Sequence, residues 1–317
     1  FTGRIHHAST DVVGRRGLTN PESDHGTNVA LVAAAAKNDS GVVGIAYQAS
    51  ILALRADGRG TCTDDCTFAD GDIAVAIRRA VDNGANVVNL SLGGGAPSSV
   101  LLDAVRYAAS KDVVIVVAAG NDGDVYDDPD IDPDRPDPFA QGLRDAGGGA
   151  VVIVGSVNES GQISGFSNRA LDYQDAFLAA LGERVCCEYR DGVLFTEPAP
   201  SGGTYVYLFS GTSFAAPQVS GAVALLAQAF PNLKATEIVE ILLETAKDAG
   251  DPGADAVYGK GILDIAAAFA PQGQTTLAGS STAVVYGAMS GVGSTTMGDA
   301  PATAMAAAVV LDKYARA

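Results

Sequence analysis

Hydrophobic residues along this chain fall into two kinds of segment that alternate. Short, wholly apolar runs are typical of strands covered on both faces of a sheet. Longer stretches with apolar residues at helical spacing are typical of amphipathic helices. The runs that predict buried strands lie at 49–56, 86–92, 113–120 and 150–157. The stretches that predict helices lie at 25–37, 68–85 and 100–112. Because the two kinds alternate, the sequence predicts a doubly wound α/β domain, with a mostly parallel sheet flanked by helices.

The pattern changes after residue 157. A β-rich excursion is predicted at 183–210. Three helices are expected after it, beginning near Ser213, at about 234–247 and at about 261–269. From residue 271 the composition shifts to Gly, Ser, Thr and Ala, and the chain ends in a short amphipathic stretch, AMAAAVVLDKYA. We therefore expect one folded domain at 1–270 and a linker or extended tail at 271–317.

One stretch, SGTSFAAPQVSG at 210–221, places a proline inside a predicted helix. From Ser213 onward the chain carries no charge over 18 residues and has the composition of a buried helix. Pro217 would break a helix interior but is tolerated in the first turn, so the helix is expected to begin at or just before Ser213. The Ser213 hydroxyl would then lie beside free backbone N–H groups, which stabilise an anion. An ordinary N-cap serine is the alternative interpretation.

Composition narrows the class of protein. The chain has 317 residues, 47% hydrophobic and 18% charged, which suits one large globular domain or a domain with a tail. The net charge of −17 argues against binding to nucleic acid or to an anionic membrane. Its wholly apolar runs reach only about eight residues, too few to span a bilayer. Because residue 1 is Phe rather than Met, we expect a fragment or a processed form, and the lack of a signal peptide establishes nothing.

The four cysteines form two local pairs. Cys62 and Cys66 bracket three residues in a loop rich in Thr and Asp, which predicts a small disulfide and an oxidising compartment. A zinc site would need more ligands, and the three histidines are poorly placed for one, so no metal ligand is assigned. Cys186 and Cys187 are adjacent and cannot easily bridge each other, which leaves buried thiols or a strained pair as alternatives.

Three short motifs supply the residue types that acyl transfer needs. His25 opens a predicted helix in DHGTNVA, Asn121 follows a buried strand in AAGND, and Ser213 opens a helix in GTSFAAP. Acyl transfer needs a base beside a hydroxyl and a donor aimed at the developing oxyanion. Taken singly, the histidine can be a helix cap and the asparagine a turn former. Together, the three residues favour a nucleophilic site.

In these motifs the chain resembles the subtilisin-like serine proteases, the subtilases. The matching stretches are HGTNVA, NLSLGG, AAGN and GTSFAAP, and the resemblance covers about residues 1–270. It implies endopeptidase activity on peptide and protein substrates through an acyl-enzyme. Ser213 would attack the peptide carbonyl, and His25 would act as general base and then as general acid. Asn121 and the backbone N–H of Ser213 would hold the oxyanion.

The same resemblance assigns a substrate site. Ser91, Leu92 and Gly93 would pair with an extended peptide as an added strand. The other wall of the pocket for the residue before the cleaved bond would be formed by Ala118, Ala119 and Gly120. Because these residues are small, the pocket is expected to accept a large apolar side chain. A flexible strand end is the alternative for the SLGGG stretch.

The C-terminal part has a second, less specific resemblance, to the subtilase passengers of bacterial autotransporters. It rests on the stretches from TEPAPSGG to FPNL, VYGKGILDIAAAFAP and AAAVVLDKYARA. The resemblance implies a membrane β-barrel domain as the partner in a full-length protein, because such a barrel follows the linker in those proteins. It also implies a secreted or cell-surface location, associated with the bacterial outer membrane. A catalytically inactive binding or adhesion passenger on the same scaffold is the alternative function.

The subtilase pattern lacks one residue here, the aspartate of the catalytic triad. Asp11 stands in TDVVG and Asp24 directly precedes His25, and neither has the expected Asp-Thr-Gly or Asp-Ser-Gly context. We expect this aspartate upstream of Phe1, on a central strand that residues 1–317 would lack. The alternative is a pseudoenzyme.

An acidic run at 121–137 is the one candidate for a cofactor, which would be calcium. Its prolines favour a solvated loop near the active site instead. No other cofactor is expected.

Overall fold

Four parallel strands form the central sheet of the molecule, in the order β3–β4–β5–β6. The computed structural model describes residues 1–14, 16–18, 22–39, 41–62, 66–190, 192–200, 202–284 and 309–317. The strands are β3 (Val87–Leu90), β4 (Val114–Ala118), β5 (Val151–Val157) and β6 (Phe177–Leu181). Every residue of β4 and β5 is buried, as their apolar sequences require for strands covered on both faces.

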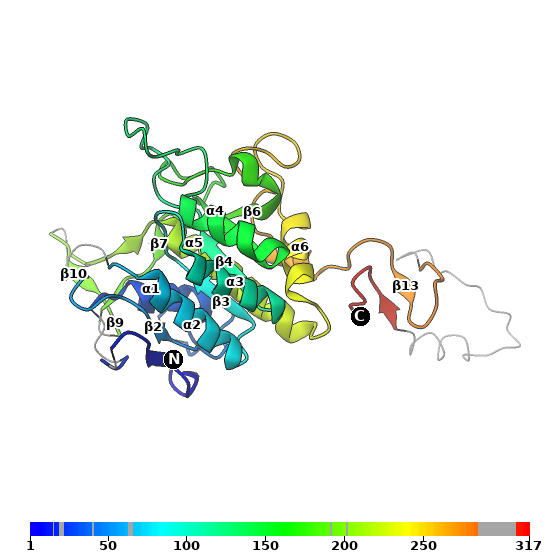
Figure 1. Cartoon of the computed structure of the whole chain (residues 1–317), viewed down its shortest axis with the longest axis horizontal. Coiled ribbons are helices and arrows are strands. Elements are labelled where there is room, and N and C mark those ends of the chain that lie inside the picture. Colours follow the sequence, from blue (N-terminus) through cyan, green and yellow to red (C-terminus); the bar gives the residue numbers. More distant parts are fainter. Residues whose placement is uncertain are drawn as a thin grey trace, which may run out of the picture.

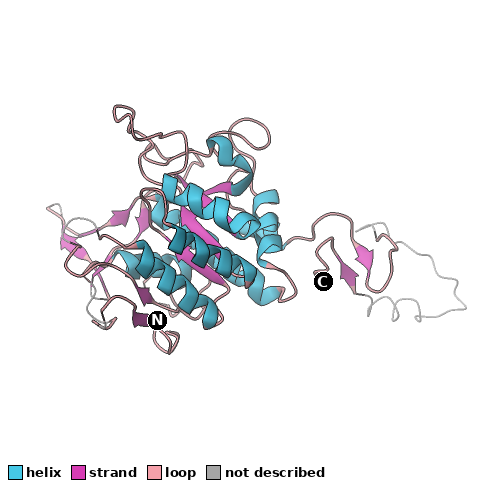
Figure 2. Cartoon of the chain, in the orientation of Figure 1, coloured by secondary structure: helices cyan, strands magenta, loops and turns pink. Residues whose placement is uncertain are grey.

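Helices cover both faces of this sheet (Figures 1 and 2). Along β4, Ile115 and Val117 pack in one core cluster with helices α2 (Asp70–Asp82), α3 (Ser99–Ser110) and α4 (Pro138–Gly147). The alternate residues Val114 and Val116 pack with α5 (Thr212–Ala229) and α6 (Ala235–Glu244) in a second cluster. Helix α1 (His25–Ala34) packs against α5. The predicted doubly wound α/β architecture is confirmed.

A second, two-stranded sheet lies beside the first. It consists of the parallel strands β1 (Thr10–Asp11) and β2 (Leu54–Arg55). Within the described residues, no ladder joins β2 to β3, although both strands line one cavity of about 1270 Å³. Helices α1 and α5 contribute to this cavity, and so does α2. The cavity thus lies between the two-stranded sheet and the central sheet, and residues of α1, α2 and α5 line it.

The two strand edges at this cavity expose backbone groups toward it. In a parallel ladder, successive peptide groups point to opposite neighbours. Across the two-stranded sheet, Thr10 N donates to Ala53 O at 3.0 Å, so the next peptide group, that of Leu54, points away from β1. In the central sheet, a β4 amide donates to Asn86 O at 3.0 Å, so the peptide group of Val87 points away from β4. One extended segment could therefore hydrogen-bond to both edges.

The described residues between 183 and 210 form the predicted β-rich excursion, built of short antiparallel pairs. Its strands are β7 (Val185–Cys186), β8 (Tyr189–Arg190), β9 (Val193–Leu194), β10 (Thr196–Pro198), β11 (Thr204–Val206) and β12 (Leu208–Phe209). The excursion is tied to α1, because Asn28 Nδ2 donates to Tyr189 O at 3.1 Å and Tyr189 N donates to Asn28 Oδ1 at 2.9 Å. Cys186 and Cys187 are paired with each other, and neither is buried.

The C-terminal residues return to the folded domain. Helix α7 (Ile265–Phe269) is followed by β13 (Thr276–Leu277), which pairs antiparallel with β14 (Val310–Leu311). Arg316 is 4% exposed, and its guanidinium donates to Ala268 O and Asp312 Oδ2. Arg316 thus fastens the C-terminal end of the chain to α7. The stretch 304–308 of the predicted amphipathic end lies outside the described residues, and the proposed boundary at 270 stays a prediction.

Three elements of the structure differ from those that the apolar pattern predicts. Helix α4 is not predicted by it because this helix contains two glycines and follows the acidic run, although Asp137 as N-cap and Pro138 at the first position are helix-start signals. Strand β6 is not among the predicted strands either, and it directly follows the 3₁₀ segment Leu171–Ala176, whereas the other such segment, Gly148–Ala150, precedes β5. Strand β2 is shorter than the predicted 49–56, since it pairs only with β1 among the described strands.

Candidate active site

Ser213 is the second residue of α5, at the carboxyl end of the parallel strands. Its side chain is half-buried, and its Oγ lies 3.5 Å from Ser91 O. Helix α5 begins after Gly211, so its first-turn amides and the positive end of its dipole are beside the Ser213 hydroxyl. The predicted position of Ser213 at a helix start is therefore where the structure places it.

Pro217 lies in the second turn of α5, not in the first turn as the sequence predicted. It is the sixth helical residue, so the carbonyl that loses its i+4 partner is that of Ser213. Ser91 Oγ donates to this carbonyl at 2.7 Å. The helix tolerates the proline here because a side chain from another element replaces the missing amide.

Asn121 is positioned by the end of β4 and by α5. Gly120 has φ +112°, a conformation that favours glycine, and it turns the chain out of the strand. Asn121 Oδ1 accepts hydrogen bonds from Thr212 N at 2.8 Å and Thr212 Oγ1 at 2.9 Å. Because these bonds occupy the amide oxygen, the Nδ2 group is left as the donor beside Ser213, and both residues line one pocket.

His25 is the first residue of α1 and is exposed. Its ring meets the ring of Phe214 edge to face, with 5.6 Å between the centroids. Since Phe214 is the neighbour of Ser213, this contact brings the α1 and α5 N-termini together. His25 and Ser213 both line the large cavity between β2 and β3.

Asp11, one of the two candidate carboxylates within the chain, is bound elsewhere. Its Oδ1 accepts from Val13 N at 2.9 Å, and its Oδ2 accepts from Arg16 N at 2.7 Å and Arg16 Nε at 2.9 Å. The hydrogen bonds from Arg16 hold the pKa of the Asp11 carboxyl far below its usual range, against the opposing effect of burial. Asp11 therefore serves the arginine network described below. The other candidate, Asp24, accepts from Asn28 through its backbone carbonyl.

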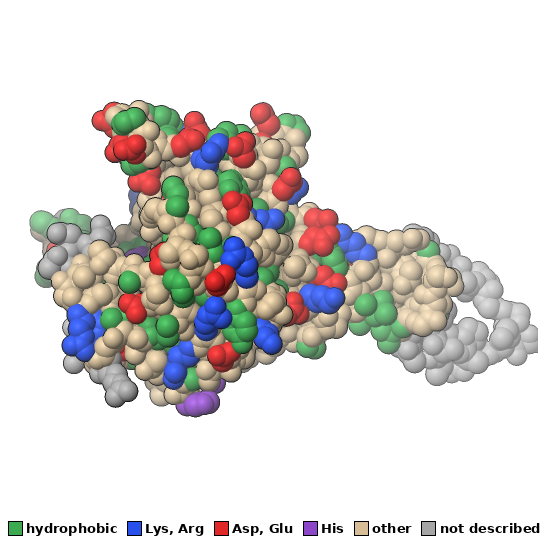
Figure 3. Space-filling model, viewed as in Figure 1, with side chains coloured by type: hydrophobic (Ala, Val, Ile, Leu, Met, Phe, Trp, Pro, Cys, Tyr) green, Lys and Arg blue, Asp and Glu red, His purple; other side chains and the backbone are tan. Residues whose placement is uncertain are grey.

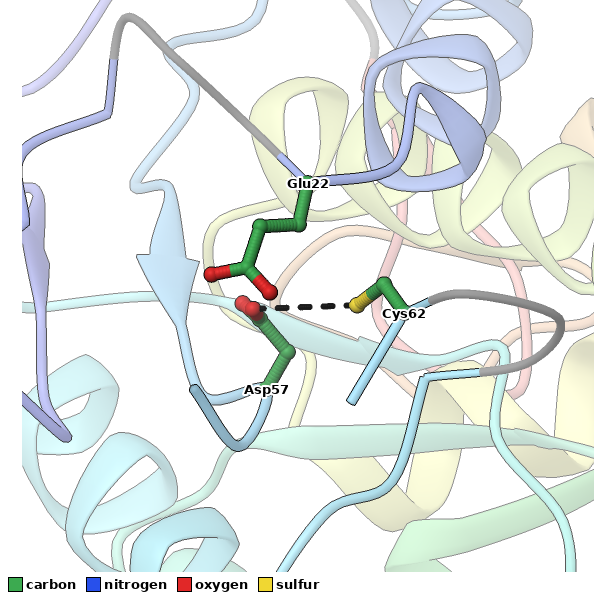
Figure 4. A group of neighbouring side chains, drawn as sticks. All are labelled: Glu22, Asp57 and Cys62. Carbon is green, nitrogen blue, oxygen red and sulfur yellow. Dashed lines mark hydrogen bonds between the residues drawn. The ribbon is translucent and has the colours of Figure 1, made fainter. Parts of the chain in front are cut away.

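Glu22, Asp57 and Cys62 form a cluster near the loop that precedes α1 (Figure 4). Their potential ligand atoms lie within 4.8 Å of one another, and Cys62 Sγ is 3.8 Å from Asp57 Oδ2. Arg16 Nη1 bridges Glu22 Oε1 at 3.1 Å and Asp57 Oδ2 at 2.9 Å.

The chemistry of this cluster is that of an ion-pair network. Arg55 Nε adds a second guanidinium contact to Asp57, at 2.9 Å, and Cys62 is joined to Cys66 by a disulfide, so its sulfur is not a thiolate ligand. Contacts with both arginines lower the pKa of Asp57 below its ordinary value, although burial opposes them. The network fastens the segment before His25 to β2.

A second pocket, of about 210 Å³, lies directly beside Ser213. Of the predicted substrate residues, it is lined by Leu92, Gly93, Ala118 and Gly120. Ala119 is fully buried and packs in the core cluster under α2–α4 instead, because side chains alternate along the strand. Ser91 lies next to this pocket, in contact with Ser213.

Two carboxylates that the sequence analysis does not single out also line this pocket, Asp122 and Asp137. Asp137 is the N-cap of α4, with Oδ1 accepting from Ala140 N at 2.8 Å and Oδ2 accepting from Gly94 N at 2.9 Å. Burial raises the pKa of Asp137 to about 7, and the charge of Asp122 adds to this rise. The Asp-Pro helix-start signal at 137–138 could have located α4, but not its proximity to Ser213.

Within the described residues, the acidic loop at 121–137 does not gather three ligands for a metal ion. Within the described chain, no three of its carboxylates bring ligand atoms together as Glu22, Asp57 and Cys62 do. Arg135 pairs with Asp172 at 2.7 Å, and Arg169 pairs with Asp134. These arginines occupy carboxylates of the loop and of its surroundings, so no step of the chemistry is assigned to calcium. The prediction of a solvated loop without a cofactor, with calcium as the alternative, stays a prediction.

Comparison with known proteins defines the class of protein. The model of the subtilase family, Peptidase_S8, matches residues 5–261. The chain therefore belongs to the subtilase family, and it is a serine protease of the subtilisin type, a hydrolase. The resemblance found in its sequence motifs is confirmed.

Individual relatives agree with this assignment. Subtilisin DY of Bacillus licheniformis is 32% identical over 272 residues, which cover 83% of this chain and 85% of that protein. Fervidolysin of Fervidobacterium pennivorans is 34% identical over 261 residues, and the match spans only 34% of that longer protein. Among solved structures, the MycP3 protease of the type VII (ESX-3) secretion system has a TM-score of 0.61 at 28% identity, covering 84% of this chain and 78% of that one.

Proposed function

We propose that the chain is a serine endopeptidase that forms an acyl-enzyme on Ser213, with His25 as general acid and base and Asn121 as an oxyanion donor. The observation that carries this proposal is the pair of bonds from Thr212 to Asn121 Oδ1. They fix the asparagine amide beside the nucleophile, so the donor is oriented before substrate binds. Such preorganised donors supply a large part of catalysis in acyl transfer.

The proposed reaction proceeds through two proton transfers in each half. Ser213 Oγ attacks the peptide carbonyl carbon while His25 removes its proton, and the carbonyl oxygen becomes an anion facing Asn121 Nδ2. Collapse of this intermediate breaks the C–N bond, and His25 donates the proton to the leaving amine. Water then attacks the ester with His25 as the base, which releases the acid product and returns the proton to Ser213.

Substrate binding is proposed along the segment that follows β3. Ser91, Leu92 and Gly93 directly follow β3, where Ser91 contacts Ser213 and the other two residues line the pocket beside it. An extended peptide laid against this segment would gain main-chain hydrogen bonds and place one side chain in the pocket. The hydrogen bond from Ser91 Oγ to Ser213 O joins this segment to the nucleophile.

The carboxylate that orients His25 is proposed to come from an added strand in the cavity between β2 and β3. Support comes from the two backbone edges that face this cavity and from His25, which lines it. One strand between these edges would join the two sheets into one. An aspartate at its carboxyl end would lie near His25.

Reaction with a fluorophosphonate tests the catalytic proposal. We expect labelling of a single serine, and Ser213→Ala should abolish both labelling and cleavage of casein while the melting temperature is retained. Ser210→Ala is the matched control, because Ser210 is exposed and three residues away. A folded protein with the added strand that neither labels nor cleaves would instead support the alternative, a non-catalytic binding passenger.

Location is proposed on the sequence resemblance alone. Export to the bacterial cell surface, as in autotransporter passengers, stays a prediction. Among the described residues, no helix has the length and apolar character needed to cross a membrane.

A further inference from the structure

The pocket beside Ser213 has a negatively charged interior. It is formed by the ends of β3 and β4, the start of α4 and the start of α5. Its described lining includes two carboxylates, Asp122 and Asp137, and neither a lysine nor an arginine. A side chain that enters this pocket from a peptide bound at Ser213 therefore meets carboxyl groups that have no lysine or arginine beside them in the described lining.

Asp137 is the deeper of the two groups, and it retains capacity to bind a cation. It is 7% exposed, and each of its oxygens accepts one backbone N–H, from Ala140 and from Gly94. A carboxylate offers about four acceptor sites, so each oxygen can accept a further hydrogen bond. The ion pairs of the described residues leave Asp137 and Asp122 out, whereas they include Asp132 and Asp134 of the same loop.

Glycine at position 93 allows the backbone to lie against this carboxylate. A Cβ on Gly93 would overlap Asp137 Oδ2. The strand backbone therefore approaches the carboxylate closely. A long side chain that passes between the Leu92–Gly93 wall and the Ala118 wall would reach Asp137 with its end.

We propose that this pocket selects lysine or arginine at the position immediately before the cleaved bond, with Asp137 and Asp122 as the specificity-determining residues. The inference rests on the proposed function, since it assigns to the pocket the residue whose carbonyl Ser213 attacks. Selection of a cationic side chain replaces our expectation from the sequence, which was a large apolar side chain because the wall residues are small. A buried carboxylate without a counterion is costly, and a cationic substrate removes that cost on binding.

The acidic loop at 121–137 favours the same class of substrate. It carries eight aspartates and one arginine. Figure 1 shows this loop, between β4 and α4, projecting from the body of the molecule, and Figure 3 shows acidic side chains gathered on that end of the surface. A field of one sign around a pocket raises the local concentration of oppositely charged substrate and its rate of association.

Binding of p-aminobenzamidine to the full chain tests the proposal without requiring catalysis. This planar cation reports its own binding by fluorescence, and the neutral p-aminobenzamide is the matched probe. We expect the amidinium to bind, competitively with Lys- and Arg-containing peptides, and the amide to bind at least about tenfold more weakly. Asp137→Asn should weaken amidinium binding by about tenfold or more, and Asp122→Asn by a smaller factor, because Asp122 is less buried.

Asp124→Asn is the control, since Asp124 is an exposed aspartate of the same loop outside the pocket. Its affinity for the amidinium should stay within about twofold of the parent chain. Equal binding of the two probes, or an unchanged affinity in a folded Asp137→Asn variant, would overturn the proposal. Amidinium binding by a folded chain that includes the added strand, without fluorophosphonate labelling of that same protein, would overturn the catalytic proposal and leave the assignment of the pocket intact.

Discussion

Ser91 Oγ donates a hydrogen bond to the carbonyl of Ser213, the same carbonyl that Pro217 leaves without a helical partner. The proline and the serine are 126 positions apart in the chain, and they are complementary in function. Pro217 removes a donor from the turn that carries the proposed nucleophile, and Ser91 supplies a donor from the segment after β3 that is proposed to bind substrate. The position of the proposed nucleophile is thereby coupled to the position of that segment.

This coupling predicts a non-additive pair of substitutions. Ser91→Ala should reduce the free energy of unfolding by about 1–3 kcal/mol, because it leaves the Ser213 carbonyl without a donor. In a Pro217→Ala background the new amide at 217 can reach that carbonyl, so the cost of Ser91→Ala should fall to a few tenths of a kcal/mol. Urea unfolding of the four proteins of this cycle measures the difference. Equal costs in both backgrounds would show that Ser91 does not compensate for the proline.

Asn121 is predicted to act on turnover rather than on substrate binding. Asn121→Ala should lower kcat by about 10²–10³, a magnitude measured for an oxyanion asparagine in subtilisin itself and not obtained from this structure. The Michaelis constant should change little. Asn121→Asp retains an oxygen for Thr212 and is the structural control, with a similar loss of turnover but a smaller change in melting temperature. A raised Michaelis constant with unchanged kcat would assign Asn121 to substrate binding instead.

The affinity of the pocket for cations is predicted to depend on pH through Asp137. Burial, together with the charge of Asp122, places the pKa of Asp137 at about 7. The charged form binds a cation, so the affinity for p-aminobenzamidine should rise as the pH increases through about 7 and level off above it. Asp137→Asn should remove this rise, and Asp124→Asn should preserve it. A flat profile for the parent chain between about pH 5.5 and 8.5 contradicts the assignment.

The same shift has a consequence for stability, with a defined sign. The pKa of Asp137 is raised in the folded state. The contribution of this group to the free energy of unfolding is therefore fully present below the ordinary aspartate pKa of 3.8, and it is lost as the pH rises through about 7. The melting temperature of Asp137→Asn minus that of the parent chain should therefore increase from pH 5 to pH 8. Thermal unfolding of both proteins across that range measures this difference, and a decrease with rising pH would contradict the prediction.

The cavity between β2 and β3 predicts that an added strand stabilises the protein. A segment that lies outside residues 1–317 and bears the proposed aspartate should raise the melting temperature and accelerate fluorophosphonate labelling of Ser213. The reason is that it would cover both open edges and fill a cavity of about 1270 Å³. A scrambled segment of equal length is the control. Equal melting and equal labelling with and without the native segment would show that the strand is dispensable.

The sequence alone determined the features whose signals are local. The continuous apolar runs of β4 and β5 predict buried parallel strands because any such strand must be covered on both faces. GTSFAAP, HGT and AAGN predict a helix start, a histidine and a strand-end asparagine in one catalytic set, because each motif is short and carries its own geometry. The tertiary structure decided which distant groups meet. No local pattern connects Ser91 with the carbonyl exposed by Pro217, or brings Asp137 from the start of α4 to the pocket beside Ser213. These relationships depend on how the sheet and helices pack, and the spacing of residues along a chain does not encode the distance between elements that only the fold brings together.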